Sequence, residues 1–257
     1  MKTIESKENP HFKAWKKLSD SARGRRKTGK IFLEGAHAIQ MFAAKFGRVE
    51  SLIFQKNFAS TVENRELCKF ADEIFEIPEN LCRFLTNLES PPAVFAVANL
   101  PQNNAEMDFQ KNTVLLDGIQ NPLNLGAILR VAAAANFSQI LISENAAHVF
   151  SPKSLRSAQG ANFALDIFEN ADLGDFVEKF QGQIFAADVG ENAQNLFSLT
   201  LENAPAAWIF GAEGQGVSES LLKKAKIVKI PMASGVESLN VASAAALCLF
   251  EVYRRFC

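Results

Sequence analysis

The sequence predicts an α/β protein with two domains, and three observations support this fold class. Short apolar runs alternate with helical segments in both halves of the chain. A polar stretch beginning Pro101-Gln102-Asn103-Asn104 interrupts this alternation and lacks helical periodicity. In the second half, glycines and polar residues follow the apolar runs, as expected where an open parallel sheet binds a ligand beyond its strand ends.

The first half predicts a small α/β domain over residues 30–100, followed by a linker over residues 101–112. Apolar runs of four to seven residues are expected to be strands, and the longer amphipathic runs are expected to be helices. The expected strands are Lys30–Leu33, Val49–Gln55, Glu73–Ile77 and Ala93–Asn99, and the expected helices are His37–Lys45, Val62–Ala71 and Asn80–Leu88.

The second half predicts a mostly parallel sheet over residues 113–257, covered by helices on both faces. Ser151 before Pro152 has the pattern of a helix N-cap followed by proline at the first helical position. The expected strands are Thr113–Leu116, Gln139–Ser143, Ile184–Asp188, Ala207–Phe210 and Ile227–Ile230, and the expected helices are Leu125–Asn136, Pro152–Gln159, Leu173–Phe180, Glu219–Ala225 and Leu239–Phe256.

Positive charge is concentrated at the N-terminus, although the net charge of the chain is −1. Residues 1–30 contain ten Lys or Arg and three acidic residues, so this stretch carries +7 and the remainder carries −8. We interpret residues 1–29 as a basic arm that binds a polyanion. A solvated terminus with no partner is the alternative.

Several other classes of protein are disfavoured. No apolar run follows the N-terminal lysines, and the longest apolar stretch, Val241–Phe250, is too short to span a bilayer. The three histidines are isolated and the cysteines lack CxxC spacing, so neither a metal site nor a disulfide framework is expected. Reduced thiols indicate a cytoplasmic protein. The four cysteines are Cys68, Cys82, Cys248 and Cys257.

The first candidate site segment runs from Leu116 to Gly126 and enters a helix that contains Arg130. Asn124 either caps this helix or belongs to a site. Arg130 lies six residues further on, so helical geometry places it about 120° around the axis and about 9 Å along it from Asn124. The two residues therefore lie on different faces, and Arg130 can approach the start of the helix only through its long side chain. A structural ion pair is the alternative role for Arg130.

Two further segments follow later strands. The pattern Gly211-x-Glu213-Gly214-x-Gly216 is neither a dinucleotide fingerprint nor a phosphate loop, and its alternative is a simple turn with an exposed Glu213. Ser238 and Asn240 precede the last helix, where Ser238 as an N-cap and Asn240 in the first turn are the alternative interpretation.

Together the three segments resemble the motifs of the SpoU (TrmH-like) class in the SPOUT superfamily of RNA methyltransferases. Their order and spacing agree across residues 113–257. The matching patterns are Asn124-x-Gly126…Arg130, Phe210-Gly211-Ala212-Glu213-Gly214-x-Gly216 and Ile230-Pro231-Met232…Ser238-Leu239-Asn240-Val241-x-x-Ala244. Residues 30–99 resemble the small RNA-binding domain that often precedes this class, with Phe32-Leu33-Glu34-Gly35 as its mark.

The resemblance implies a deep trefoil knot in the C-terminal domain, a homodimer packed through the last helix, and S-adenosylmethionine as the methyl donor. Packing rules disfavour knots, so the knot is expected from the resemblance alone. The implied cofactor contacts are Gly211, Gly216, Ile230, Met232 and Leu239. The expected RNA contacts of the arm are Lys16, Lys17, Arg23, Arg25, Arg26 and Lys27.

The implied reaction is methylation of a ribose 2′-hydroxyl in RNA. Ribosomal RNA is favoured over transfer RNA, because the small preceding domain is commoner in the ribosomal members of the class. A hydroxyl is a poor nucleophile at neutral pH, so negative charge that develops on its oxygen must be stabilised. Arg130 is the candidate, and because a guanidinium keeps its proton to above about pH 12, we expect electrostatic stabilisation rather than proton abstraction. Asn124, Glu213, Ser238 and Asn240 are expected to fix Arg130 and the ribose.

Two alternatives stay open, and a third is disfavoured. A transfer RNA methyltransferase would share all the motifs. A non-catalytic RNA-binding or ribosome-assembly factor on the same fold would not need the five polar side chains. A nucleotide-dependent dehydrogenase would require G-x-G-x-x-G after the first strand of a domain, and neither domain supplies it.

Overall fold

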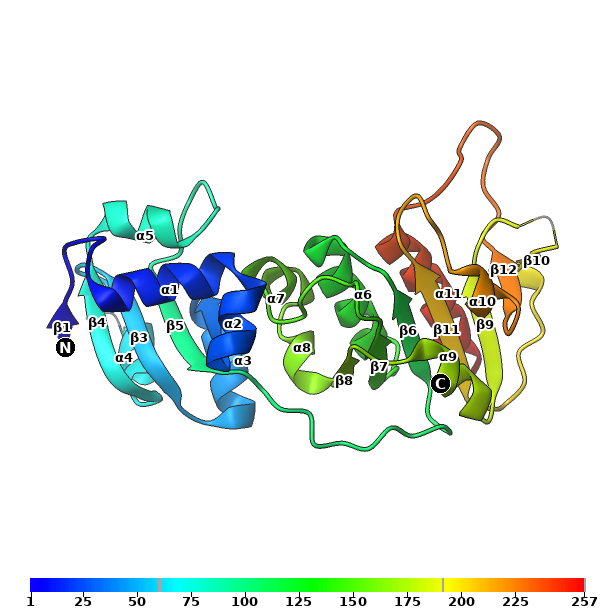
Figure 1. Cartoon of the computed structure of the whole chain (residues 1–257), viewed down its shortest axis with the longest axis horizontal. Helices are drawn as coiled ribbons and strands as arrows, with labels where there is room; N and C mark the ends of the chain where they lie inside the picture. The colour runs from blue at the N-terminus through cyan, green and yellow to red at the C-terminus, as the bar shows by residue number, and fades with distance from the viewer. Residues whose placement is uncertain (60–61, 191, 257) are drawn as a thin grey trace. The chain divides into compact units, whose positions relative to one another are not determined.

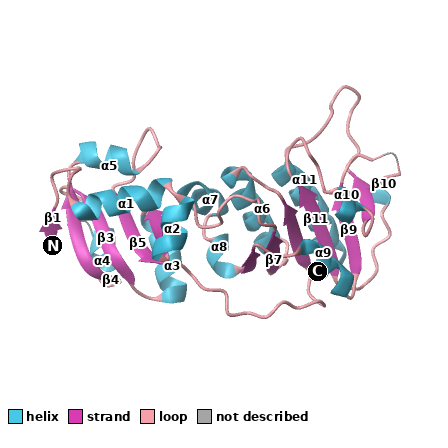
Figure 2. Ribbon diagram, viewed as in Figure 1, coloured by secondary structure: helices cyan, strands magenta, loops and turns pink. Residues whose placement is uncertain are grey.

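The computed structural model describes residues 1–59, 62–190 and 192–256. The chain forms two compact units (Figures 1 and 2). The N-terminal unit comprises residues 1–102 together with residues 150–163, and the C-terminal unit comprises residues 103–149 and 164–257. Cys257 lies outside the described residues. Among the described helices, none combines the length and hydropathy needed to cross a membrane.

The N-terminal unit contains a five-stranded sheet in the order β1-β4-β3-β5-β2. The pairs β1–β4 and β3–β4 are parallel, whereas β5 runs antiparallel to both β3 and β2. The strands are β1 (Lys2–Thr3), β2 (Lys30–Glu34), β3 (Val49–Gln55), β4 (Ala71–Ile77) and β5 (Val94–Asn99). The helices that accompany the sheet are α1 (Pro10–Asp20), α2 (Ala22–Thr28), α3 (Ala36–Phe46), α4 (Val62–Cys68) and α5 (Glu79–Leu85).

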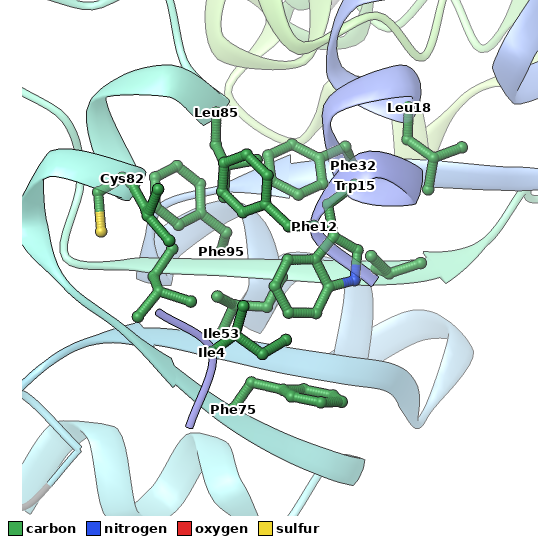
Figure 3. Close-up of a cluster of buried hydrophobic side chains, with 13 residues drawn as sticks. Ile4, Phe12, Trp15, Leu18, Phe32, Ile53, Phe75, Cys82, Leu85 and Phe95 are labelled. Carbon is green, nitrogen blue, oxygen red and sulfur yellow. The ribbon is translucent and has the colours of Figure 1, made fainter. Parts of the chain in front are cut away.

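Residues 1–29 are part of this unit and do not project from it as a separate arm. Asn9 caps α1 by accepting a hydrogen bond from the His11 backbone N–H, and Pro10 occupies the first turn. Phe12, Trp15 and Leu18 face inward from α1, where they join a buried cluster with aromatic side chains of the sheet (Figure 3). The predicted boundary at residue 29 therefore does not separate two structural parts, because one face of α1 is apolar.

A segment from the second half of the sequence also packs in the N-terminal unit. It carries α7 (Pro152–Ala158) and α8 (Ala161–Ala164), and Phe163 meets the ring of Phe42 edge-on at 5.6 Å between centroids. Arg156 on α7 forms an ion pair with Glu34, whose side chain is only 2% exposed. Burial raises the pKa of Glu34, and the positive charge of Arg156 opposes that rise. The sequence gives no local signal that this segment leaves the C-terminal unit.

The C-terminal unit contains a seven-stranded sheet in the order β10-β12-β9-β11-β6-β7-β8, and all its pairs are parallel. This confirms the predicted parallel sheet. Both β8 and the short β10 were not expected from the sequence. The strands are β6 (Thr113–Asp117), β7 (Gln139–Ile142), β8 (Asp166–Glu169), β9 (Gln183–Ala187), β10 (Gln194–Asn195), β11 (Ala206–Gly211) and β12 (Lys226–Lys229).

Helices pack against this sheet, and every residue of β11 is buried. Leu173, Phe176 and Val177 of α9 join a core cluster with Leu115 and Ile209 from the strands. The last helix packs against α6 and against β11 and β9. The helical elements are α6 (Pro122–Ala134), α9 (Leu173–Lys179), the 3₁₀ turn η1 (Leu196–Ser198), α10 (Glu219–Leu222) and α11 (Val241–Phe256).

Candidate active site

The candidate site lies at the carboxyl edge of the seven-stranded sheet, where the loops after β6, β11 and β12 meet. The Asp117 Oδ2 atom accepts a hydrogen bond from the Ser218 backbone N–H at 2.8 Å, which ties the end of β6 to the loop after β11. The Gly118 N–H donates to Ser143 Oγ at 2.8 Å, which ties the same loop to the end of β7. Parallel strands thus bring segments about 90 residues apart in sequence to one edge.

Three predicted site residues, Asn124, Glu213 and Asn240, form one hydrogen-bonded group, which we call the polar cluster. The Asn124 side-chain amide donates to Glu213 Oε1. The Asn240 amide donates to Asn124 Oδ1 at 3.0 Å and to Glu213 Oε1 at 3.2 Å. One carboxylate oxygen therefore receives two N–H donors, which fixes the Glu213 side chain in place.

Helix capping explains how the polar cluster is oriented. Asn121 caps α6 by accepting from the Leu123 N–H at 2.9 Å, so the alternative in which Asn124 is the cap is wrong. Asn124 lies in the first turn, and its side chain is free to reach the loop after β11. Asn240, not Ser238, caps α11, because its Oδ1 accepts from the backbone N–H of Ala242 at 3.0 Å. Asn240 uses its oxygen for the helix and its amide for the cluster.

The loop after β11 is closed by glycines. The Gly216 N–H donates to the Ala212 carbonyl oxygen at 2.9 Å, which folds the loop back on itself. A Cβ atom added at Gly211 would lie 2.0 Å from the Gly216 carbonyl carbon, so only glycine permits this approach. The tight loop holds Glu213 against the starts of α6 and α11.

Two cavities adjoin the polar cluster. The larger cavity has a volume of about 630 Å³, and the smaller one has a volume of about 330 Å³. Ala212, Glu213 and Val241 line both, so the cluster stands at their common wall. The described lining of the larger cavity includes two acidic residues, Asp188 and Glu213, and no Lys, Arg or His. That cavity therefore favours a neutral or cationic ligand.

The structure brings most of the predicted site residues to these cavities. The larger cavity is lined by the expected cofactor residues and by Ser238, while Asn124 lines the smaller one. Arg130 differs, because it is exposed on α6, lines neither cavity and makes no hydrogen bond or ion pair with the described residues. The expected cofactor residues at the cavity are Gly211, Gly216, Ile230, Met232 and Leu239.

Sequence reasoning missed two parts of the cavity walls. Asp188 follows β9 and lines the larger cavity, and Gln120 lines the smaller one. The rule that ligands bind beyond strand ends applies equally to β9, but no glycine cluster marks its end. In the described part of the chain, no group of three or more His, Cys, Asp or Glu is placed to hold a metal ion.

The basic residues near the N-terminus do not all face solvent. Arg25 is only 3% exposed, and its guanidinium donates to the carbonyl oxygens of Leu18 and Ser19 at 2.6 and 3.1 Å. Arg25 thus holds the end of α1 and is not available to bind RNA. Lys16 is half-buried and forms an ion pair with Asp20. The remaining candidates, which are exposed, are Lys17, Arg23, Arg26 and Lys27.

An open parallel sheet with a ligand-sized cavity beyond its strand ends is typical of an α/β protein that binds a small organic ligand. The SpoU rRNA Methylase family matches residues 111–250, and the MRM3-like substrate binding domain matches residues 9–96. The chain belongs to the SpoU rRNA methylase family and is a methyltransferase. The class predicted from the three motifs is confirmed.

Relatives and solved structures agree with this assignment. The chain is 28% identical to the 23S rRNA (guanosine(2553)-2′-O)-methyltransferase RlmP of Bacillus subtilis, over 98% of this chain and 99% of that protein. It is 30% identical to an uncharacterized tRNA/rRNA methyltransferase of Synechocystis sp., over 98% and 94%. The crystal structure of the SpoU methyltransferase AviRb from Streptomyces viridochromogenes with AdoMet matches with a TM-score of 0.84 and 26% identity, over 96% of this chain and 98% of that one. The trefoil knot stays a prediction.

Proposed function

We propose that this protein transfers a methyl group from S-adenosylmethionine to a ribose 2′-hydroxyl of ribosomal RNA. The observation that carries the proposal is the polar cluster on the wall shared by the two cavities. A donor in one cavity and an acceptor ribose in the other would meet at Glu213. A transfer reaction requires this kind of juxtaposition, because the reacting atoms must be held in contact and in line.

The larger cavity fits the donor in size and charge. Its volume of about 630 Å³ falls within the range of about 300–1,000 Å³ that is usual for small-molecule sites. Its wall combines apolar side chains such as Ile230 and Met232 with two carboxylates, which suits an adenosine whose ribose carries a positively charged sulfur. The bound donor supplies an electrophilic methyl group. The protein's residues would hold the acceptor ribose, accept the proton of its 2′-hydroxyl and stabilise the charge that develops on the 2′-oxygen.

The smaller cavity would take the acceptor ribose. Glu213 Oε1 is occupied by the two amides of the cluster, and the second carboxylate oxygen makes no hydrogen bond to the described residues. We assign that oxygen to the 2′-hydroxyl: it would accept the hydroxyl's hydrogen bond and then take up its proton as the 2′-oxygen is methylated. Asn124 and Asn240 would keep the carboxylate in one orientation, and Ser238 would border the donor side.

Arg130 would stabilise the charge that develops on the 2′-oxygen. Because it lines neither cavity of its own chain, it needs bound RNA or a second copy of the chain to bring it to an acceptor site. A second copy is supported by α11, which packs against α6 and exposes Leu247, Phe250 and Tyr253. We propose a homodimer through this face, since exposed apolar side chains of this size favour burial.

The N-terminal unit would bind the RNA backbone through the exposed cations of α1 and α2. Ribosomal RNA is favoured because the matched domain is a substrate-binding domain that precedes an rRNA methylase, and because RlmP modifies 23S rRNA. Such a substrate would place the protein in the cytoplasm with the ribosomes. A transfer RNA substrate is the alternative.

Single-turnover transfer of a labelled methyl group to bulk RNA tests the proposal. Wild-type protein should label ribosomal RNA at a 2′-hydroxyl, and Arg130→Ala should bind donor and RNA normally but lose at least about tenfold in rate. Label confined to transfer RNA would favour the alternative substrate, and the absence of label from both RNAs would contradict the proposal. A normal rate for Arg130→Ala with both ligands saturating would exclude the role assigned to Arg130.

A further inference from the structure

The larger cavity contains one carboxylate that the proposed chemistry does not use. Asp188 directly follows β9, and its backbone N–H donates to the Val228 carbonyl oxygen at 3.1 Å, which fixes its position. Its side chain is half-buried in the cavity wall and makes no hydrogen bond or ion pair with any described residue. Its Oδ2 atom stands 3.0 Å from where a Cβ on Gly216 would be, so the carboxylate points toward the glycine loop.

The order of the strands places Asp188 between two chemically different ends of the cavity. At one end Glu213 follows β11 and adjoins the smaller cavity, so the sulfonium must lie there to deliver its methyl group. At the other end Val228, Ile230 and Met232, on and after β12, provide an apolar wall for the adenine. Strand β9 lies between β11 and β12 in the sheet. The ribose joins the sulfonium to the adenine and would therefore lie over β9.

We propose that Asp188 recognises the ribose of S-adenosylmethionine by accepting hydrogen bonds from its two vicinal hydroxyls. A carboxylate has two oxygens and accepts two donors side by side, which matches the spacing of a vicinal diol. No described residue donates a hydrogen bond to the Asp188 carboxylate, so the hydroxyls of a bound ligand would satisfy it. This inference rests on the proposed function for the identity of the donor. The rival partner for Asp188 is the ammonium group of the methionine part.

Isothermal titration calorimetry with the full chain separates these partners. The probes are S-adenosylhomocysteine and 5′-methylthioadenosine, which keeps the ribose diol but lacks the ammonium group. Asp188→Asn should weaken both by a similar factor of roughly 10 to 100, the usual effect of losing hydrogen bonds to a charged group. Asp175→Asn on α9 removes the same charge from an exposed site away from the cavity and should leave both affinities unchanged.

The 2′-deoxy analogue of 5′-methylthioadenosine completes the test. It should bind wild-type protein more weakly than 5′-methylthioadenosine, and Asp188→Asn should largely abolish that difference. Weakening of S-adenosylhomocysteine alone would assign Asp188 to the ammonium group and overturn the inference, as would unchanged affinity for both probes. If wild-type protein bound neither probe, the proposed function itself would fail. If wild-type protein bound both probes and Asp188→Asn bound them equally well, only the role assigned to Asp188 would fail.

Discussion

Replacing Gly211 by alanine would test whether the closed glycine loop forms the donor cavity. The added Cβ would lie 2.0 Å from the Gly216 carbonyl carbon and 2.2 Å from the Val217 nitrogen, whereas ordinary contacts begin near 3.4 Å. The loop must therefore move by about 1.4 Å. Such a shift breaks the Gly216–Ala212 hydrogen bond and withdraws Glu213 from Asn124. Overpacking of this kind costs about 1–3 kcal/mol.

The loop opens to relieve this strain, but the ligand binds only when the loop is closed. Closing the loop on the ligand therefore costs about the same 1–3 kcal/mol of binding free energy. We expect S-adenosylhomocysteine to bind Gly211→Ala roughly 5- to 150-fold more weakly in calorimetry. The melting temperature should fall by about 2–4 °C for each kcal/mol lost from folding.

Gly235→Ala is the matched control, since it adds the same methyl group to the loop after β12 at a residue that does not line the donor cavity. Gly235 has a φ of 90° with nothing within 4 Å of the added atom. This variant should lose about 1–2 kcal/mol of stability from backbone strain and keep the affinity for the ligand. Wild-type affinity in a folded Gly211→Ala protein, or equal losses in both variants, would refute the reasoning.

Three further changes have defined outcomes. Asn240→Asp keeps the oxygen that caps α11, but it replaces the amide that donates to Glu213 with a second carboxylate, so the rate of methyl transfer should fall at least about tenfold. Asn240→Ala loses the cap as well as the amide, so it should also lose about 1 kcal/mol of stability from the missing cap. Full activity in Asn240→Asp would contradict this. Removing the exposed charges of Arg26 and Lys27 should make the negative slope of the log RNA association constant against log salt concentration shallower by roughly 1.5, without altering the affinity for the methyl donor. An unchanged slope would show that neither cation contacts a phosphate. Phe250→Glu should convert a dimer into monomers in sedimentation equilibrium, and a dimer that survives it would place the interface elsewhere.

Much of the site could be predicted because its residues sit where an apolar strand ends. The loops after β6, β11 and β12 each combine glycines with amides or acids, and this contrast is visible in the sequence. The loop after β9 contributes Asp188 without such a contrast. The proposed role of Asp188 depends on the position of β9 between β11 and β12 in the sheet. That strand order cannot be predicted from the residues around Asp188 alone.

The sequence at the start of α6 contains a signal that distinguishes its two asparagines. Asn121 and Asn124 are both capping residue types, but only Asn121 precedes a proline, and proline favours the first helical position. Choosing Asn121 as the cap frees Asn124 for the polar cluster. Similarly, the spacing of Phe12, Trp15 and Leu18 marks an apolar helical stripe that the surrounding positive charges obscured. Because these three side chains are part of the core, deleting residues 1–30 would destabilise the N-terminal unit as well as remove charge. Substitution of single exposed charges therefore tests RNA binding more directly than the deletion does.

The position of Arg130 follows from helix geometry, and it leads to a sharper test of the dimer. Six residues of helix carry Arg130 about 120° away from Asn124, and the structure places it outside both cavities of its own chain. If a second copy presents Arg130 to the acceptor site, a mixed dimer of Arg130→Ala and Asn240→Asp chains contains one site with both residues intact. Random mixing of the two impaired variants should then raise activity to about one quarter of the wild-type value, since half of the dimers are mixed and each mixed dimer has one intact site. If Arg130 acts within its own chain, every site carries a defect, and mixing would restore nothing.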